Sequence, residues 1–343
     1  MCVWIRDGVL PDPDNAVDAR SFATAAARQG LVAWLDEVVP ARHPSWSREL
    51  RDDLRAAHFR ALAEGVRHHD LARRAQQLLD ARGLRSLVLK GAALVETHYP
   101  SPAHRPMSDV DLLALDQPAQ AQRLLLEAGF KEQSSGDHAC ALQDPEGAGT
   151  LELHHSLTSC PGLFPMDADT AWRDHVDTPA GLHVAAPEPL LVQLALHAAF
   201  QHGLALSLGQ YLDFRRVLER PLDVERVLRA ADAAGAREAL RLALEAAAAV
   251  VGAVPPPALA DALRGPRPRW LARRLQEPVR CVEPAPPALV PARWRAARGR
   301  RLQLLRLTLA GPPAAPGLST WTRGWSRVTR AAGLARWVLR GAR

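Results

Sequence analysis

The sequence predicts an α+β fold in which a small mixed sheet lies between helical segments on either side of it in the chain. Two apolar stretches rich in branched residues, 84–89 and 109–115, have the character of buried strands, and a short helical pattern, 92–98, lies between them. Residues 50–79 and the segment from residue 187 onward carry apolar side chains at helical spacing. A strand–helix–strand core with flanking helices accounts for these patterns.

The first of these strands ends at a turn that contains Lys90 and Gly91. Pro100 and Pro102 then force a loop, and Arg105 follows it. Lysine is rare in this chain, because only two of its 43 basic residues are not arginine. A lysine at this turn is therefore less likely to be incidental than it would be in a lysine-rich protein.

The second strand carries two acidic residues, Asp109 and Asp111. Residues two apart on a strand point to the same face, so both carboxylates project together while Val110 points the other way. Paired carboxylates repel each other and are costly to desolvate unless a cation lies between them. Oxygen ligands suit Mg²⁺, so the pair predicts a divalent metal site.

Two more strands are expected at residues 138–143 and 150–157, after a helix at 118–128. Glu152 lies between two leucines of the last strand, so it faces opposite to them and needs a partner if it is buried. An edge-strand glutamate that faces water is the alternative. His154 shares the face of Glu152, and could orient an acid or a phosphate or be an ordinary packed or surface histidine.

The spaced set LKGAAL…YP…R…DVDLL resembles one bacterial family, the "uncharacterised nucleotidyltransferase" family of the DNA polymerase beta-like nucleotidyltransferase superfamily. The resemblance covers roughly residues 50 to 220. Lys90-Gly91 stands where most relatives have Gly-Ser, which removes a hydroxyl that often touches a phosphate. The resemblance implies a small mixed-sheet nucleotidyltransferase core and the transfer of an NMP from an NTP to an acceptor, with release of pyrophosphate.

The resemblance also implies a set of site residues. Asp109, Asp111 and Glu152 would bind Mg²⁺ (or Mn²⁺) and act as the catalytic acids, since the superfamily places its third carboxylate on a strand such as 150–157. Two metal ions are implied: Asp109 and Asp111 would hold the one on the triphosphate, and all three acids would bind the second, which lowers the pKa of an attacking hydroxyl. The acceptor is not written in any motif, and a small molecule, a peptide, a protein or an RNA end remains open.

Nucleotide binding is expected from the turn and from the loop that follows. Gly91 at a helix N-terminus allows a phosphate to approach backbone N–H groups, Lys90 adds a point charge, and Arg105 adds a bidentate clamp. The resemblance extends to a helix that contains Asp213, which could support the site. The alternative is a solvated acid paired with Arg216, one turn further on.

Three other interpretations stay open. The chain could be a catalytically inactive nucleotide- or nucleic-acid-binding module with the same fold. It could be a glycosyltransferase, since these also use Asp-x-Asp, although more strands would then be expected before the motif. The acid pair could also be structural.

Two histidine clusters predict no metal site. His68, His69 and Asp70 are adjacent in a helical segment, where neighbours do not share a face, so we expect solvated surface. His197 and His202 are five residues apart, whereas zinc-binding pairs on a helix favour a spacing of four.

The length of 343 residues allows two or three structural units. We expect an N-terminal helical segment (1–83), the α/β core (84–185), a C-terminal helical domain (186–283) and an Arg/Trp-rich helical tail (284–343). The tail contains twelve arginines, four tryptophans and no acidic residue. It could contact a polyanion such as RNA, or its arginine stems could cover the body and the helix ends.

No apolar run approaches the length of a membrane span, and the first residues do not have the pattern of a signal peptide. The four cysteines lie far apart, without metal-ligand spacing. Reduced thiols and a cytoplasmic location are therefore expected.

Overall fold

The computed structural model describes residues 19–42, 46–135, 139–271 and 292–310. In the described part of the chain, three helices precede the sheet: α2 (Ala19–Arg28), α3 (Val32–Arg42) and the 33-residue α4 (Arg48–Asp80). The apolar pattern of residues 15–39 predicts a single helix, and this prediction is wrong for the described part, because Gly30 has a φ of +69° and separates α2 from α3. Ser47 caps α4, since its side chain accepts a hydrogen bond from the backbone N–H of Leu50.

Among the described residues, seven strands form one mixed sheet in the order β3-β4-β5-β2-β1-β7-β6. The strands are β1 (Ser86–Val88), β2 (Asp109–Ala114), β3 (Lys131–Ser135), β4 (Ala139–Gln143), β5 (Thr150–His154), β6 (Val176–Asp177) and β7 (His183–Val184). The two strands predicted around the Lys-Gly turn are neighbours, because β1 pairs antiparallel with β2. On its other side β2 pairs parallel with β5. The predicted α+β fold class is confirmed.

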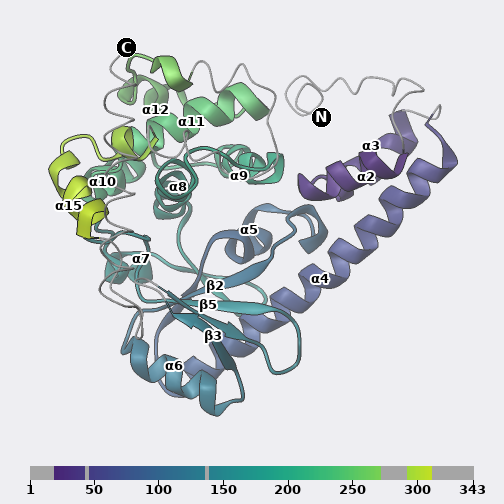
Figure 1. Ribbon diagram of the computed structural model, residues 1–343, viewed down its shortest axis with the longest axis horizontal. Coiled ribbons are helices and arrows are strands. Elements are labelled where there is room, and N and C mark those ends of the chain that lie inside the picture. The colour runs from purple at the N-terminus through teal and green to yellow at the C-terminus, as the bar shows by residue number, and fades with distance from the viewer. Residues whose placement is uncertain (1–18, 43–45, 136–138, 272–291, 311–343) are drawn as a thin grey trace.

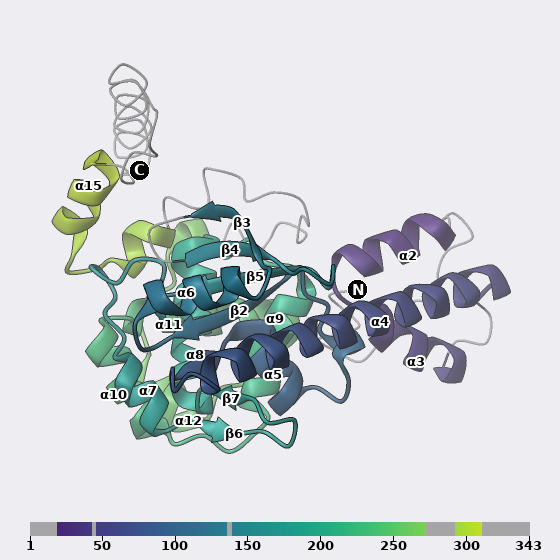
Figure 2. The same ribbon diagram turned by 90° about the horizontal axis from the view of Figure 1, so that it is seen from below.

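One face of the sheet is covered by the C-terminal half of α4 and by α6 (Pro118–Glu127), as Figures 1 and 2 show. Leu71 and Leu79 of α4 pack there with Val110 and Leu112 of β2 and with Leu125 of α6. Val110 is fully buried in this cluster. The aspartates on either side of it therefore point to the opposite face, as the alternation predicts.

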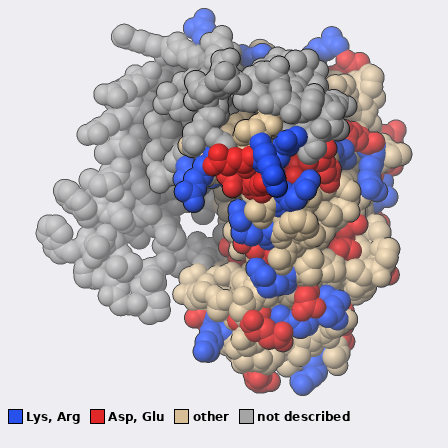
Figure 3. Space-filling view, turned by 90° about the vertical axis from the view of Figure 1, so that its right-hand side faces the viewer, with Lys and Arg blue, Asp and Glu red and all other residues tan. Residues whose placement is uncertain are grey.

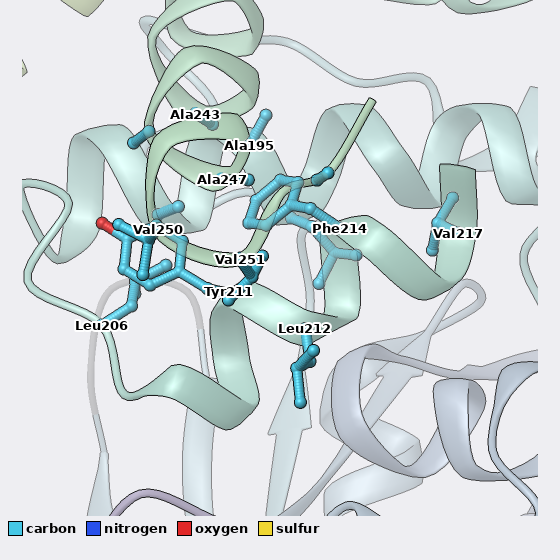
Figure 4. Packing of buried hydrophobic residues seen from close by; sticks show 14 of the residues in the cluster. Ala195, Leu206, Tyr211, Leu212, Phe214, Val217, Ala243, Ala247, Val250 and Val251 are labelled. Carbon is cyan, nitrogen blue, oxygen red and sulfur yellow. The ribbon is translucent and has the colours of Figure 1, made fainter. Parts of the chain in front are cut away.

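Above that opposite face lie α5 (Lys90–His98) and the C-terminal helices (Figure 1). The C-terminal helices are α8 (Pro187–Leu196), α9 (Leu208–Leu218), α10 (Val224–Ala234), α11 (Arg237–Val251) and α12 (Pro257–Ala262). These helices share a hydrophobic core cluster. In it, the ring of Phe214 in α9 lies against the small side chains of Ala247 and Val251 in α11 (Figure 4). The N-terminal helices α2 and α3 belong to the same apolar cluster.

A histidine of α4 is less exposed than its sequence predicts. His68 is buried, with 7% of its surface exposed, because the loop at Gly149 packs against it. Burial lowers its pKa. The expectation of solvated surface is thus wrong for His68, while His69 pairs with Glu96, 2.5 Å between Nε2 and Oε1.

The tail is described only from residue 292 to 310, which includes α15 (Arg301–Ala310); the tryptophans beyond it lie outside the described residues. Arg293 donates to the carbonyl of Phe200, and Arg300 donates to the carbonyl of Ala234 at the end of α10. Acidic and basic side chains are intermixed on the face drawn in Figure 3. These contacts fit arginines that cover helix ends, and contact with a polyanion stays a prediction.

Among the described residues, no helix combines the length and the apolar character that a membrane crossing requires. Cys140 and Cys160 form no disulfide in the part of the chain that the structure describes.

The contribution of the α9–α11 cluster can be measured with two phenylalanines. Phe214→Ala should lower the free energy of unfolding by about 3–5 kcal/mol, because it opens a cavity in a close-packed core. Phe59→Ala removes the same atoms from a side chain that is 63% exposed, and should change the free energy of unfolding by less than about 0.5 kcal/mol. Urea denaturation followed by circular dichroism gives both values, and equal losses would contradict the packing described.

Candidate functional site

The parallel pairing of β2 with β5 brings the three predicted acids together. Asp111 lies directly opposite Glu152 in the register, and Asp109 lies two residues earlier on β2. All three line a cleft of about 550 Å³, within the range of roughly 300–1,000 Å³ typical of ligand pockets. Lys90, Gly91 and Arg105 line the same cleft. All six predicted metal- and nucleotide-binding residues therefore lie around one cavity.

Asp111 is the most enclosed of the acids, with 7% of its side chain exposed. Its Oδ1 accepts hydrogen bonds from Nζ of Lys90, at 2.6 Å, and from Nε2 of His154, at 2.8 Å. Burial alone would raise the pKa of Asp111, but Lys90 and His154 outweigh it and hold this pKa well below the usual range. The carboxylate is therefore ionised.

His154 joins two of the acids. Its Nε2 also lies 3.3 Å from Oε2 of Glu152. Burial lowers the pKa of His154, but its contacts with Asp111 and Glu152 raise it above the usual value. The hydrogen bond from His154 in turn lowers the pKa of Glu152. The prediction that His154 lies on the same face as Glu152 is confirmed. Its contacts with Asp111 and Glu152 hold these two carboxylates in position.

Asp109 has weaker compensation. Among the described residues its side chain accepts one hydrogen bond, at 3.2 Å from the hydroxyl of Ser108. Burial raises the pKa of Asp109, and the charges of Asp111 and Glu152 raise it further. The charge of Lys90 only partly offsets these effects, so the negative charge of Asp109 is less compensated than that of Asp111.

A divalent cation fits this donor set. Three carboxylates line one cleft, and ligand oxygens of Asp111 and Glu152 lie within 4.8 Å of each other, while His154 donates its ring proton to Asp111. Oδ2 of Asp111 accepts no hydrogen bond from the described residues, so it is available as a ligand. Hard oxygen ligands and uncompensated negative charge favour Mg²⁺ or Mn²⁺.

Lys90 has an uncommon backbone conformation. It is the first residue of α5, and its φ of +47° lies in the left-handed region that side chains other than glycine rarely adopt. Such strain costs on the order of 1–3 kcal/mol and concentrates at functional sites. The helix thus begins two residues earlier than the sequence predicts, and the lysine rather than the glycine makes the turn.

Gly91 makes a close contact in addition to the phosphate approach expected of it. A Cβ at this position would lie 2.8 Å from Sδ of Met107, closer than real contacts allow. Gly91 therefore lets the segment that leads into β2 pack against the start of α5. This contact brings the turn and the aspartates to the same side of the cleft.

Arg105 is fixed by Asp213. Its Nε donates to both carboxylate oxygens of Asp213, at 2.7 and 3.0 Å, and Nη1 donates to the carbonyl of Pro106. Tyr99 donates its hydroxyl proton to the same carboxylate, at 2.7 Å. Asp213 is buried and does not pair with Arg216, so the alternative of a solvated acid is wrong.

A pair of histidines at the cleft was missed by sequence reasoning. Residues His197–Gln201 form a π turn, in which the N–H of His202 bonds to the carbonyl of His197. This wider turn places Nε2 of His202 2.9 Å from Nε2 of His197, so the expectation that they lie apart is wrong. Both line the cleft, as does Gln201. The two histidines come together because the helix changes here from α to π hydrogen bonding. The pattern of a single sequence does not show this change.

The protonation of this pair follows from its hydrogen bonds. Oε1 of Gln201 accepts from Nδ1 of His197, at 2.9 Å. Nε2 of His197 therefore carries no proton and accepts from Nε2 of His202. Burial, helped by the charge of Lys90, lowers the pKa of His197 to about 3. The cleft thus has a neutral imidazole pair opposite its acids.

Protein stability should depend on pH through His197. The unfolded residue takes up a proton near pH 6.5, whereas the folded residue does so only near pH 3, so stability is lost as the pH falls between these values. The loss approaches about 1.4 kcal/mol per pH unit. Urea denaturation of the wild type and of His197→Gln at pH 7, 6 and 5 tests this. His155→Gln, which removes an exposed histidine, is the control. A slope unchanged in His197→Gln would contradict the assignment.

The chain was compared with known proteins, and its family follows from that comparison. No curated protein sequence matches the chain. Its fold resembles the solution structure of the antibiotic-resistance factor ANT(2'')-Ia, with 12% identity and a TM-score of 0.37 over 48% of this chain and 89% of that chain. It also resembles an antigenic nucleotidyltransferase-like protein from Paracoccidioides brasiliensis, with 23% identity and a TM-score of 0.31 over 45% and 73% of the two chains. Both likenesses are too distant to inform the site.

Family membership rests on the sequence itself. The family described as "Uncharacterised nucleotidyltransferase" matches residues 15–252, well over half of the chain. The match includes every residue placed around the cleft, from the turn at Lys90 to the helix that carries Asp213. The chain belongs to the uncharacterised nucleotidyltransferase family.

Proposed function

We propose that the protein is a metal-dependent nucleotidyltransferase that moves an NMP from an NTP to a hydroxyl or similar group of an acceptor. One observation carries the proposal: three carboxylates of two paired strands converge on a cleft of about 550 Å³ that also contains a lysine and an arginine. Family membership supports this activity over that of an Asp-x-Asp glycosyltransferase.

Each residue has a role that follows from its contacts. Asp109, Asp111 and Glu152 would hold the divalent metal, and His154 keeps two of these carboxylates in place through its hydrogen bonds. The bound metal supplies charge neutralisation for the triphosphate and activates the attacking hydroxyl. The acceptor oxygen then bonds to the α-phosphorus, the bond to the leaving oxygen breaks, and pyrophosphate departs.

The basic side chains would bind the phosphates of the NTP. Asp213 and Pro106 fix Arg105, whose Nη2 makes no hydrogen bond with the described residues and can donate to a phosphate oxygen. Lys90 would leave Asp111 when the triphosphate and its metal bind, because the metal then supplies the positive charge. Phosphoryl transfer depends mainly on such positioning and charge neutralisation.

The contact between Lys90 and Asp111 also favours a second candidate. At 2.6 Å the ammonium group of Lys90 already compensates one carboxylate, and a cation from the chain can replace a metal ion. The protein would then be an inactive nucleotide- or nucleic-acid-binding module. The two candidates differ in whether nucleotide binding requires a metal.

Two asparagine variants should separate metal binding from folding. Asp109→Asn and Asp111→Asn should each weaken Mg²⁺-dependent NTP binding by at least about a hundredfold. Their stabilities should differ: Asp109→Asn relieves repulsion and keeps or raises the Tm, whereas Asp111→Asn leaves Lys90 without its partner and lowers the Tm.

Thermal shifts with and without Mg²⁺ and each NTP measure both effects. Asp52→Asn is the matched control, because Asp52 is 66% exposed on α4. A wild-type protein without any metal-dependent shift at millimolar NTP would count against the enzyme. Transfer itself is tested by incubation with labelled NTP, Mg²⁺ or Mn²⁺ and cell extract, followed by mass spectrometry for an NMP-tagged product.

Lys90→Ala distinguishes the two candidates directly. If the protein is an enzyme, Lys90→Ala should bind the metal ion as well as the wild type does, or better, because Lys90 is not a metal ligand. It should bind NTP more weakly, because one side chain that contacts the phosphates is lost. In a metal-independent module it should lose nucleotide binding with or without Mg²⁺. Calorimetric titration with Mg²⁺ alone, and then with NTP in Mg²⁺ or EDTA, gives the answer.

A further inference from the structure

A second cluster of possible metal ligands lies on the hairpin of β6 and β7, at the edge of the sheet. His175, Asp177 and His183 bring one ligand atom each within 4.8 Å of one another. Nε2 of His175 is 3.1 Å from Oδ1 of Asp177, and Nδ1 of His183 is 2.6 Å from the same oxygen. The three side chains therefore converge on one point outside the cleft described above.

The protonation of His175 leaves an acceptor at this point. Its Nδ1 hydrogen-bonds to the backbone carbonyl of Trp172, which can only accept, so Nδ1 carries the proton. In the neutral ring Nε2 then presents a lone pair to the carboxylate of Asp177. Two acceptors at this distance repel each other unless a cation or a second proton lies between them.

His183 has the complementary arrangement. While Nδ1 faces Asp177, Nε2 lies 3.5 Å from Oδ2 of Asp80 at the end of α4. Histidines that bind metals usually give their other ring N–H to a carboxylate or a backbone carbonyl, which fixes the tautomer. His183 has the carboxylate and His175 has the carbonyl, so both rings carry this second layer of contacts.

We propose that His175, Asp177 and His183 form a binding site for a divalent transition-metal ion of the zinc class. Two imidazole nitrogens and one carboxylate oxygen are a donor set that Zn²⁺ accepts, whereas Mg²⁺ prefers oxygen alone. Zinc bonds of about 2.0 Å place tetrahedral ligand atoms about 3.3 Å apart, close to the separation of His175 and Asp177. Asp177 is 70% exposed and can adjust, and a water can complete the coordination.

The surroundings indicate a structural role. Trp172 of α7 (Ala168–Arg173) stacks on the ring of His175, with ring centroids 4.2 Å apart and planes at 11°. Asp80 belongs to α4, and β7 pairs with β1, the strand that leads into Lys90. A metal ion here would tie the short edge hairpin to α7 and α4.

The site can be tested in the full-length protein with Co²⁺, whose visible absorption reports nitrogen and oxygen ligands. Millimolar Mg²⁺ is present throughout to occupy the acid cluster of the cleft. The wild type should bind one Co²⁺ that Zn²⁺ displaces. His175→Ala and His183→Ala should each weaken binding by at least about a hundredfold, and Asp80→Asn by about tenfold, since outer partners of metal ligands contribute that much.

His58→Ala is the control, because His58 pairs with Asp36 at 2.9 Å in a histidine–aspartate contact of the same kind elsewhere. It should leave the Co²⁺ spectrum unchanged. Zn²⁺ should raise the Tm of the wild type and not that of His183→Ala. A wild type that binds neither ion, or hairpin variants that bind Co²⁺ as the wild type does, would overturn the proposal and leave ordinary histidine–aspartate ion pairs.

Discussion

The buried carboxylate of Asp111 is the constraint on which the rest of the cleft depends. A charge with so little exposure is stable only when hydrogen-bond donors surround it. Its two donors come from different neighbours of β2: Lys90 follows β1 on one side, and His154 ends β5 on the other. The order of three strands thus places an acid, a lysine and a histidine at one point. The strained backbone of Lys90 is the local cost of reaching that point.

A second set of contacts closes the cleft from the helical side. Asp213 of α9 fixes Arg105, and the N–H of Gly209, at the start of the same helix, donates to the carbonyl of Gln29, between α2 and α3. A Cβ at Gly209 would lie 3.0 Å from that carbonyl oxygen, so the two segments approach closely. The N-terminal helices, which look peripheral in the sequence, therefore form part of the wall.

Local periodicity predicted much of this arrangement, and longer-range geometry was invisible to it. The shared face of Asp109 and Asp111 follows from strand alternation, and the position of Glu152 follows from alternation together with the family pattern. The partner of Asp213 lies 108 residues away, so no spacing rule could have found Arg105. Lys90 was expected to face phosphate, and its contact with Asp111 depends on a φ value that lysine rarely adopts.

The π turn at His197–Gln201 makes this part of the chain sensitive to length rather than to residue type. A π turn contains one residue more than the α-helical turn it replaces. Loss of any one residue within it would restore the ordinary helix and move His202 by about 100° around the axis, away from His197. A substitution within the turn keeps the number of residues between the two histidines, whereas a single deletion changes it and would separate the pair. Natural variation in this segment should therefore occur by replacement and rarely by gaps.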